Sequence, residues 1–290
     1  MGLCCSSARR SHPLPDLVRI RHSTVPAPLR LALHLFDLAA YEVLYRFSPV
    51  SRKMFFNGGY LPLAPDMQQL PALKGEEAST MMYHLLLRGM VADLAPNPQV
   101  ILDVGCGQGG GLLYAHALHP GVRLYGTDRN GTATRKAARA VADIPGSRLV
   151  KGSDDDIRFE AACADFVISV GAPTYFGLTR FVGEAARVCR PGGIIAFSGG
   201  YRQGDHAVIE AELRDAASGS GLVFHRYRDI TPHTFAALKA DIPRREAELA
   251  RVPWPFRLYG RKWADMPGSA EYDEYATGRR ADFACVLRKP

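Results

Sequence analysis

The residues best suited to chemistry in this sequence form a glycine-rich turn after a run of apolar residues. The segment 100–111 reads Val-Ile-Leu-Asp-Val-Gly-Cys-Gly-Gln-Gly-Gly-Gly, so a predicted buried strand ends directly in the turn. Glycines are required there because a side chain would block a ligand that lies on the backbone and would strain the tight turn. Gly105, Gly107 and Gly110 also satisfy the GxGxxG pattern of dinucleotide-binding sites, so the turn alone leaves the nucleotide cofactor open.

Two aspartates stand near this turn in the predicted arrangement of strands. Asp103 lies two residues before the first glycine of the turn. Asp128 ends the next strand, in Tyr-Gly-Thr-Asp, where its carboxylate can accept hydrogen bonds from both hydroxyls of a ribose. Dehydrogenases share this second feature, so it indicates a nucleoside cofactor without identifying it.

The elements that must position these residues follow from an alternating pattern that begins at residue 99. Apolar strand-like runs alternate with amphipathic helical patterns, which predicts βαβ units and a mostly parallel sheet with helices on both faces. Strands are predicted at 100–104, 122–127, 148–151, 165–170, 194–198, 222–228 and 281–287. Helices are predicted at 109–118, 132–142, 178–188, 206–217 and about 232–251.

The residues before this α/β series, up to residue 95, have a different pattern. Residues 1–27 form a predicted disordered basic tail, with five arginines against one aspartate in the first thirty residues. Its opening Met-Gly-Leu-Cys-Cys-Ser fits a lipidation pattern, which we interpret as a chance match without membrane attachment. Residues 28–95 form a predicted helical lid or arm, with a largely apolar helix at 28–47 and another at about 75–93. Such an apolar surface predicts a homo-oligomer through the 28–47 helix, beside a core domain at 96–290.

The composition excludes several classes of protein. The chain has 290 residues, 47% of them hydrophobic and 22% charged, so it can bury a large core and is not disordered throughout. No apolar run reaches the ~18–20 residues of a transmembrane helix. Six scattered cysteines without zinc spacing predict a cytoplasmic protein with no metal site. The net charge of +7 includes no basic block interleaved with aromatic residues, so we expect no nucleic-acid partner.

A third motif distinguishes between the possible cofactors. The segment 186–193, Ala-Arg-Val-Cys-Arg-Pro-Gly-Gly, leads into the fifth predicted strand. Together with the glycine turn and Asp128, in this order and spacing, it resembles the class I S-adenosylmethionine-dependent methyltransferases over about residues 99–200. The resemblance implies a Rossmann-like seven-stranded sheet and S-adenosylmethionine as the cofactor.

More narrowly, the chain resembles natural-product methyltransferases of actinobacteria. Some features are similar to the phenolphthiotriolone methyltransferases, and others fit enzymes that methylate terpenoid indole lactams. The residues that carry this resemblance are Asn57 and Tyr60, Tyr83 and His84, the 28–47 helix, the Arg-Asp-Ile-Thr run at 228–231, and 256–261. The resemblance implies methyl transfer to carbon or oxygen of a hydrophobic or aromatic secondary metabolite, a small-molecule partner.

The roles of the family's cofactor-binding residues carry over by position. The glycines would face the methionine and ribose parts, the first aspartate would orient the loop or reach the amino group, and the second would bind the ribose. The family usually has an acid directly after the glycine that follows strand three, to contact the adenine amine. This chain has Ser153 there, so the next residue is the candidate, although 154–156 fits a solvated acidic loop equally well. The cofactor-binding candidates are Asp103, Gly105, Gly107, Gly109, Asp128 and Asp154.

A conventional base is missing after the fourth predicted strand, where many relatives have an acid and a histidine. The segment 171–176 reads Gly-Ala-Pro-Thr-Tyr-Phe, and tyrosine normally titrates near ~10. Tyr175, His206 and His233 remain as candidates for a catalytic role. Methyl transfer from a sulfonium depends mainly on holding the nucleophile in line, and a carbon acceptor needs no base in that step.

Aromatic residues are expected to line an acceptor pocket beyond the carboxyl ends of strands four and five, beneath the N-terminal helix. The candidates, each of which can equally be a packing residue, are Tyr41, Tyr45, Phe55, Phe56, Tyr60, Tyr175, Phe176 and Tyr201. Two alternatives remain open: an NAD(P)-dependent oxidoreductase with a Rossmann fold, and a non-catalytic binding module that keeps the cofactor fold. Binding of S-adenosylmethionine rather than NAD(P)H excludes the first, and turnover of an acceptor excludes the second.

Overall fold

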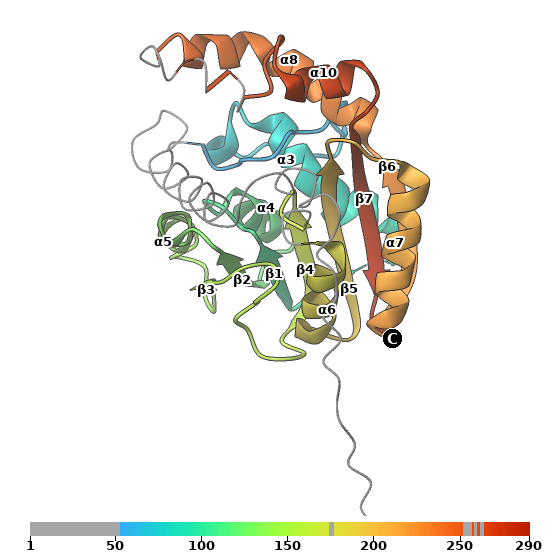
Figure 1. Cartoon of the computed structure of the whole chain (residues 1–290). Helices are drawn as coiled ribbons and strands as arrows, with labels where there is room; N and C mark the ends of the chain where they lie inside the picture. Colours follow the sequence, from blue (N-terminus) through green and yellow to red (C-terminus); the bar gives the residue numbers. More distant parts are fainter. Residues whose placement is uncertain (1–52, 95, 174–176, 252–256, 258–259, 262–263) are drawn as a thin grey trace, which may run out of the picture. The chain divides into compact units, whose positions relative to one another are not determined.

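The computed structural model describes residues 53–94, 96–173, 177–251, 257, 260–261 and 264–290. A seven-stranded sheet passes through this part of the chain in the order β3-β2-β1-β4-β5-β7-β6 (Figure 1). Its strands are β1 (Val100–Val104), β2 (Arg123–Asp128), β3 (Arg148–Lys151), β4 (Ala164–Val170), β5 (Cys189–Tyr201), β6 (Val223–Asp229) and β7 (Ala281–Arg288). The seven predicted strands are confirmed, and β5 extends beyond the predicted 194–198 at both ends.

The order of the strands places a switch point at the centre of the sheet. The chain moves outward from β1 through β2 to β3, and then returns to the other side of β1 with β4 and β5, all parallel. Only β7 is antiparallel to its neighbours, β5 and β6. Ligands of open α/β sheets bind beyond the carboxyl ends of the strands at such a switch point, here between β1 and β4.

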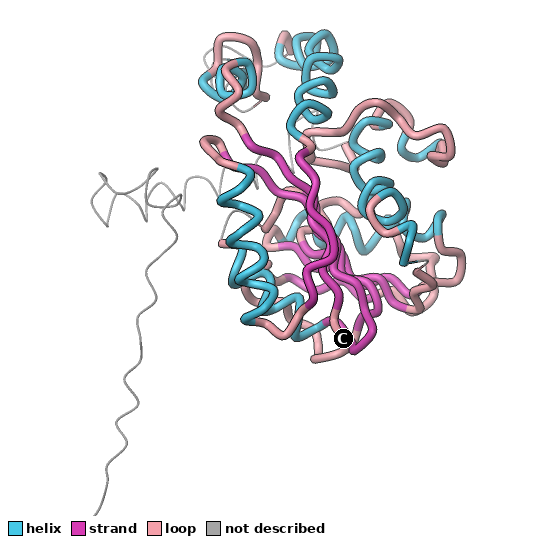
Figure 2. Tube along the Cα trace, turned by 90° about the vertical axis from the view of Figure 1, so that its right-hand side faces the viewer, coloured by secondary structure: helices cyan, strands magenta, loops and turns pink. Residues whose placement is uncertain are grey.

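Helices cover both faces of the sheet, as the alternating pattern predicts (Figure 2). Along β1 the apolar residues Val100, Leu102 and Val104 pack into the core beneath α6 (Leu178–Val188) and α7 (His206–Gly219). Ile101 packs into the other core, with side chains of α3 (Glu77–His84) and α4 (Gly110–Leu118). Because side chains alternate along a strand, Asp103 points to the α3 and α4 face. Helix α5 (Gly131–Ala140) packs beside β2 and β3.

The predicted helix at 75–93 is helical in the structure, but it is not one continuous α-helix. It consists of α3, a π-helical turn at Leu85–Gly89 and a 3₁₀ turn at Ala92–Leu94. In the π turn the Met90 amide donates to the Leu85 carbonyl at 2.7 Å, five residues back. Three consecutive leucines, Leu85, Leu86 and Leu87, are buried in this wider turn.

Two C-terminal helices lie beyond the carboxyl ends of the parallel strands (Figure 1). They are α8 (Thr231–Leu249) and α10 (Ala270–Ala276), and the Phe235 and Tyr275 rings stack between them at 5.3 Å. The predicted helix at 232–251 is therefore confirmed within two residues at each end. These helices enclose the side of the sheet on which the acceptor pocket is expected.

Several expectations concern residues that the structure does not describe. The predicted tail at 1–27 and the predicted helix at 28–47 lie outside the described residues. Within the described part, Cys106, Cys163, Cys189 and Cys285 are free thiols. No group of three or more metal-ligating side chains occurs among the described residues. None of the described helices is long and apolar enough to cross a membrane.

Candidate cofactor site

The glycine turn between β1 and α4 is held against the end of β2. The amides of Gly105 and Cys106 both donate to the Thr127 carbonyl, at 2.8 and 3.0 Å. Gly105 has a φ angle of +80°, and a Cβ there would lie 2.7 Å from the Cβ of Ala172, so the close approach of the chain after β4 requires glycine. A Cβ on Gly107 would meet no atom of the described residues within 4 Å, so this part of the chain leaves space for a ligand beside the turn.

Asp128, the last residue of β2, forms hydrogen bonds with the segments that follow β1, β2 and β3. One carboxylate oxygen, Oδ2, accepts from the Gly107 amide at 3.0 Å, and Oδ1 accepts from the Asn130 amide at 2.8 Å. Its carbonyl accepts from the Gly152 amide at 3.1 Å. Burial raises the pKa of Asp128, and the two amide hydrogen bonds oppose this shift. Each carboxylate oxygen has a second lone pair, so Asp128 can also accept from the hydroxyls of a ribose.

Asp103 is the most deeply buried acid of the site. The Tyr83 hydroxyl donates to its Oδ2 at 3.2 Å, while its Oδ1 is buried and has no hydrogen-bond partner. Burial raises the pKa of Asp103 to about 8, with a further increase from Asp128 and an opposing effect of the Tyr83 hydrogen bond. A buried carboxylate oxygen without a partner is costly, so Oδ1 is suited to a cationic donor from a ligand.

Tyr83 reaches Asp103 because α4 begins with glycines that leave room for aromatic rings. A Cβ on Gly111 would overlap the Tyr83 ring, and a Cβ on Gly110 would lie 2.8 Å from the Phe55 ring. The Phe55 and Tyr83 rings are 5.5 Å apart and tilted. Tyr83 is not among the cofactor-binding residues predicted from the sequence. Two sequence features could have indicated it. Tyr83 is part of the Tyr83–His84 pair that resembles the related methyltransferases, and the glycines at 110 and 111 leave room for an aromatic ring at the start of α4.

Asp154 is the acid that follows β3, and the structure buries it. Only 6% of its surface is exposed, its Oδ2 has no partner, and burial raises its pKa to about 7. The Thr127 hydroxyl, at the end of β2, is also buried without a partner. Ser153, at the usual position of the family's acid, donates from its hydroxyl to Asp155 at 2.6 Å. A solvated loop does not bury a carboxylate in this way, so the geometry favours Asp154 as a ligand-binding residue.

These residues fit S-adenosylmethionine by the chemistry of their donors and acceptors. The cofactor carries an ammonium group, two ribose hydroxyls and an adenine amine, all of which donate hydrogen bonds. The structure offers three carboxylates at the ends of β1, β2 and β3, two of them with an unpartnered buried oxygen. An open space lies beside the glycine turn that these acids flank. By position, Asp103 would hold the ammonium group, Asp128 the ribose and Asp154 the adenine amine.

The predicted catalytic histidines contribute to packing between elements. His206 contacts the Tyr227 hydroxyl at 2.6 Å through Nδ1 and Asp229 Oδ1 at 3.0 Å through Nε2, so its ring connects α7 to the end of β6. His233 Nδ1 lies 2.6 Å from the Leu61 carbonyl and donates to it, which connects α8 to the N-terminal arm. Neither histidine lies with the acids of the cofactor site. Tyr175 lies outside the described residues.

The predicted acceptor residues are only partly described, and the described ones do not gather in one place. Tyr60 is buried and stacks on His233 with ring centroids 4.5 Å apart. Tyr201 is buried and stacks on Phe283 beneath α7. Phe56 is 37% exposed. The other candidates, outside the described residues, are Tyr41, Tyr45, Tyr175 and Phe176.

Comparisons with known proteins agree with this geometry. Residues 102–197 match the family model of a methyltransferase domain. Over 232 residues the chain is 30% identical to the probable phthiotriol/phenolphthiotriol dimycocerosates methyltransferase 2 of Mycobacterium ulcerans, with 79% of this chain and 86% of that protein covered. It is 38% identical to the phthiotriol/phenolphthiotriol dimycocerosates methyltransferase of Mycobacterium leprae over 100 residues, 34% of this chain and 36% of that protein. The chain thus matches only about a third of the length of the M. leprae relative.

The solved structures agree in fold. The geranyl diphosphate C-methyltransferase from Streptomyces coelicolor A3(2), crystallised with Mg²⁺, geranyl diphosphate and S-adenosyl-L-homocysteine, has a TM-score of 0.61 and 18% identity. The alignment covers 88% of this chain and 97% of that one. Fold, site and relatives together establish that the chain belongs to the class I S-adenosylmethionine-dependent methyltransferases. Within this class, the phthiotriol/phenolphthiotriol dimycocerosates methyltransferases are among its relatives. S-adenosylmethionine is its cofactor.

Proposed function

We propose that the chain transfers a methyl group from S-adenosylmethionine to carbon or oxygen of a hydrophobic small molecule. The observation that carries this proposal is the row of three acids, Asp103, Asp128 and Asp154, around an open glycine turn. When bound, the cofactor supplies a methyl group on a positively charged sulfonium, which is already an activated leaving group. The names of the relatives, which refer to lipid and terpenoid acceptors, support a hydrophobic acceptor.

The chain's own residues would act mainly by binding and orientation. Asp103 would accept from the ammonium group, and Tyr83 would keep its carboxylate turned toward that group. The turn at Gly105 and Gly107 would allow the cofactor to lie against the backbone. Holding the acceptor in line with the methyl group accounts for most of the expected acceleration, because proximity and orientation can supply a large part of a reaction barrier.

The acceptor side of the proposal rests on the predicted aromatic residues. They are Tyr41, Tyr45, Phe56, Tyr60, Tyr175, Phe176 and Tyr201, of which Tyr60 stacks on His233 and Tyr201 stacks on Phe283. An acceptor that is a carbon nucleophile requires no base in the methylation step. An alcohol or an acid acceptor loses its proton to solvent or to a neighbouring group.

The domain organisation, assembly and location belong to the same proposal. We expect a tail at 1–27, an arm at 28–95 that acts as a lid, and a catalytic core at 96–290. The apolar character of the 28–47 sequence supports a homo-oligomer that this helix joins. The scattered free thiols support a cytoplasmic location. Light scattering that finds the full chain monomeric would contradict the oligomer.

Turnover with labelled cofactor tests the activity. The purified chain is incubated with methyl-labelled S-adenosylmethionine and a panel of apolar alcohols, acids and alkenes, and label is counted in an organic extract. Gly107→Ala serves as the inactive control, because its methyl group would lie in the space expected for the cofactor and would meet no described atom within 4 Å. Its φ angle of +54° strains an alanine, so circular dichroism checks that this variant folds. Binding of the cofactor without transfer to any apolar acceptor would contradict the proposal and favour a binding module.

A further inference from the structure

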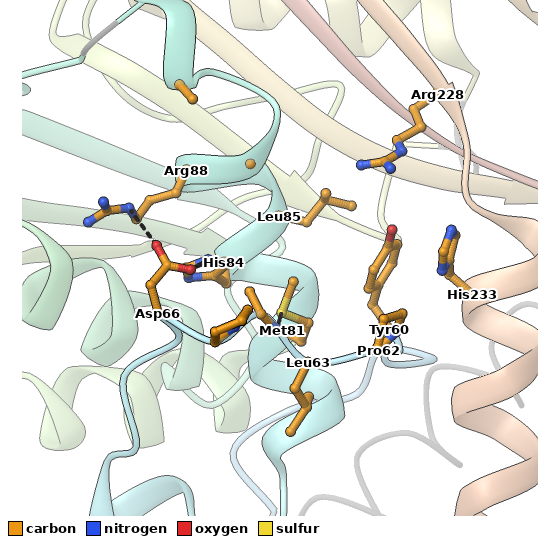
Figure 3. Close-up of a pocket in the computed structure, with 14 residues that line it drawn as sticks. Tyr60, Pro62, Leu63, Asp66, Met81, His84, Leu85, Arg88, Arg228 and His233 are labelled. Atoms are coloured by element: carbon orange, nitrogen blue, oxygen red, sulfur yellow. Dashed lines mark hydrogen bonds and ion pairs between the residues drawn. The ribbon is translucent and has the colours of Figure 1, made fainter.

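A cavity lies on a different side of α3 from the glycine turn. It has a volume of about 470 Å³ and is formed by the arm segment 60–66, α3 with its π turn, the end of β6 and the start of α8 (Figure 3). Tyr83, which faces Asp103, does not line it. None of its lining residues belongs to the glycine turn or follows β1, β2, β3 or β4, so this pocket is separate from the cofactor site.

Much of the pocket wall is apolar, and the guanidinium of Arg228 points into the pocket. The apolar wall is formed by Pro62, Leu63, Ala64, Met81, Leu85 and Ala92. The guanidinium of Arg228 extends from β6 into the space above Leu85 and the Tyr60 ring (Figure 3). Among the residues that the structure describes, the Arg228 side chain, which is exposed, has no hydrogen bond or ion pair, and its charge acts on the nearby Tyr60 hydroxyl.

The remaining charges of the pocket leave this arginine unbalanced. Arg88 pairs with Asp66 at 3.7 Å, and Asp66 also lies 3.3 Å from His84 Nε2. Burial lowers the pKa of His84, and the nearby Asp66 carboxylate opposes this shift. Asp229, next to Arg228 in the chain, accepts from the Thr231 amide at 2.8 Å and contacts His206. One uncompensated positive charge therefore faces an apolar pocket.

We propose that this pocket binds an amphipathic carboxylate, whose head pairs with Arg228 and whose apolar body lies against Leu63, Met81 and Leu85. A guanidinium presents a planar pair of donors that matches the two oxygens of a carboxylate. The volume falls within the usual range of small-molecule sites, which are mainly apolar with few polar groups. The ligand would join the N-terminal arm to β6 and α8. The proposal does not depend on the methyl-transfer activity.

Calorimetry with decanoate and decanol on the full chain tests this site, with S-adenosyl-L-homocysteine present so that no methyl transfer occurs. Decanoate should bind the unmodified chain, and Arg228→Gln should weaken this binding by about tenfold or more, because a charge-assisted hydrogen-bonded pair is lost. Decanol, which has the same chain length without the charge, should also bind about tenfold more weakly than decanoate. Arg139→Gln, which removes another exposed arginine, on α5, should leave the affinity for decanoate unchanged.

Three results would overturn the proposal. The first is no binding of decanoate, and the second is equal binding of decanol and decanoate. The third is equal affinity of decanoate for the Arg228→Gln variant and the unmodified chain, which would place the fatty chain elsewhere, such as in the methyl-acceptor site. Both substituted side chains are exposed, so we expect both variants to fold, and circular dichroism checks this.

Discussion

Acidic side chains gather in two regions near the carboxyl edge of the sheet, and the two groups differ in their partners. The cofactor acids, Asp103, Asp128 and Asp154, follow β1, β2 and β3 or lie on them. The structure gives no ion pair to any of the three among the described residues. Asp103 and Asp154 each have a buried oxygen without a partner, and burial raises the pKa of both.

The C-terminal acids, Glu271, Glu274 and Asp282, have partners within the chain. Glu274 accepts from two nitrogens of Arg202 at 2.8–3.0 Å, and Glu271 Oε1 lies 3.2 Å from the same arginine. Asp282 accepts from Arg280 at 2.9 Å, and also from the hydroxyls of Tyr275 and Thr234 at 2.6 and 2.7 Å. One oxygen, Glu271 Oε2, lacks a partner in this group.

The difference separates acids that hold the fold together from acids that hold a ligand. A buried carboxylate with an arginine and two hydroxyl donors connects elements, here β7 with α8 and α10. A buried carboxylate without these donors costs stability in the free protein and gains its partners only when a ligand binds. Substitutions in the C-terminal group should therefore affect folding, and substitutions in the cofactor group should affect binding.

The largest effect is expected from Asp282→Ala. This change leaves Arg280 and Tyr275 without their acceptor in a buried position, which typically costs about 3–5 kcal/mol of unfolding free energy. Asp282→Asn, which keeps the shape and one acceptor oxygen, should lose less. Urea unfolding measures both variants. A loss below about 1 kcal/mol for Asp282→Ala would mean that this network does not stabilise the fold.

Asp128→Ala should have the second largest effect, on cofactor binding and, through the loss of the acceptor for the Gly107 and Asn130 amides, to a smaller extent on stability. Two ribose hydroxyls would lose a charged acceptor, which weakens the affinity for S-adenosyl-L-homocysteine by about 1.5–3 kcal/mol, or roughly 10–150-fold. Asp143→Ala, which removes an exposed acid, is the matched control and should bind normally. Calorimetry measures the affinities, and unchanged binding by the Asp128 variant would remove this residue from the site.

The sequence predicts the strands and the acids of the cofactor site better than it predicts which aromatic side chains meet, for a physical reason. The strands are marked by apolar runs, and the glycine turn with its flanking acids is local in sequence, so β1 to β3 and the positions of the three acids follow from short segments. Tyr83 reaches Asp103 only because α3 packs on the glycines at the start of α4. The packing of Tyr60 on His233 is equally non-local. Aromatic residue types alone do not distinguish such packing from a ligand pocket.

The dependence of stability on pH should distinguish the cofactor acids from the C-terminal acids. The expected effect is smaller than that of Asp128→Ala and larger than that of the last substitution below. Folding raises the pKa of Asp103 from 3.8 to about 8 and that of Asp154 from 3.8 to about 7. A raised pKa means that the folded state binds more protons than the unfolded state. The contribution of these two carboxyls to the free energy of unfolding is therefore fully present below about pH 4 and is lost as the pH rises through 7 to 8. Each proton contributes a slope of up to about 1.4 kcal/mol per pH unit.

Denaturant unfolding of the free chain between pH 6 and 8.5 measures this slope. Asp103→Asn should reduce the slope, because the amide does not titrate. The carboxyls of Asp93, Glu160 and Glu184 have lowered pKa values, so they change protonation below this window and do not contribute to it. A slope that is identical in the unmodified chain and in Asp103→Asn would show that this carboxyl titrates normally in the folded state.

The smallest effect is expected from Tyr83→Phe, which removes one hydroxyl and leaves the ring. The Asp103 side chain would lose its one hydrogen bond to the described residues, so its carboxylate would be less well oriented toward the ammonium group of the cofactor. A net loss of about 1 kcal/mol corresponds to roughly fivefold weaker binding of S-adenosyl-L-homocysteine. Binding of the ammonium group should strengthen as Asp103 loses its proton. Because the Tyr83 hydrogen bond lowers the pKa of Asp103, the substitution should shift this increase in affinity to a higher pH.

Tyr114→Phe provides the matched control for this last comparison. Tyr114 is also fully buried, but its hydroxyl contacts His84 at 2.9 Å and accepts from the Gln68 amide, with no acid of the cofactor site nearby. This variant should lose a similar amount of stability and keep both the affinity and its pH profile. If Tyr83→Phe and Tyr114→Phe show the same pH profile of binding, the Tyr83 hydroxyl stabilises the fold in the same way as the C-terminal network. A shift confined to Tyr83→Phe means that the hydroxyl positions Asp103 for the cofactor.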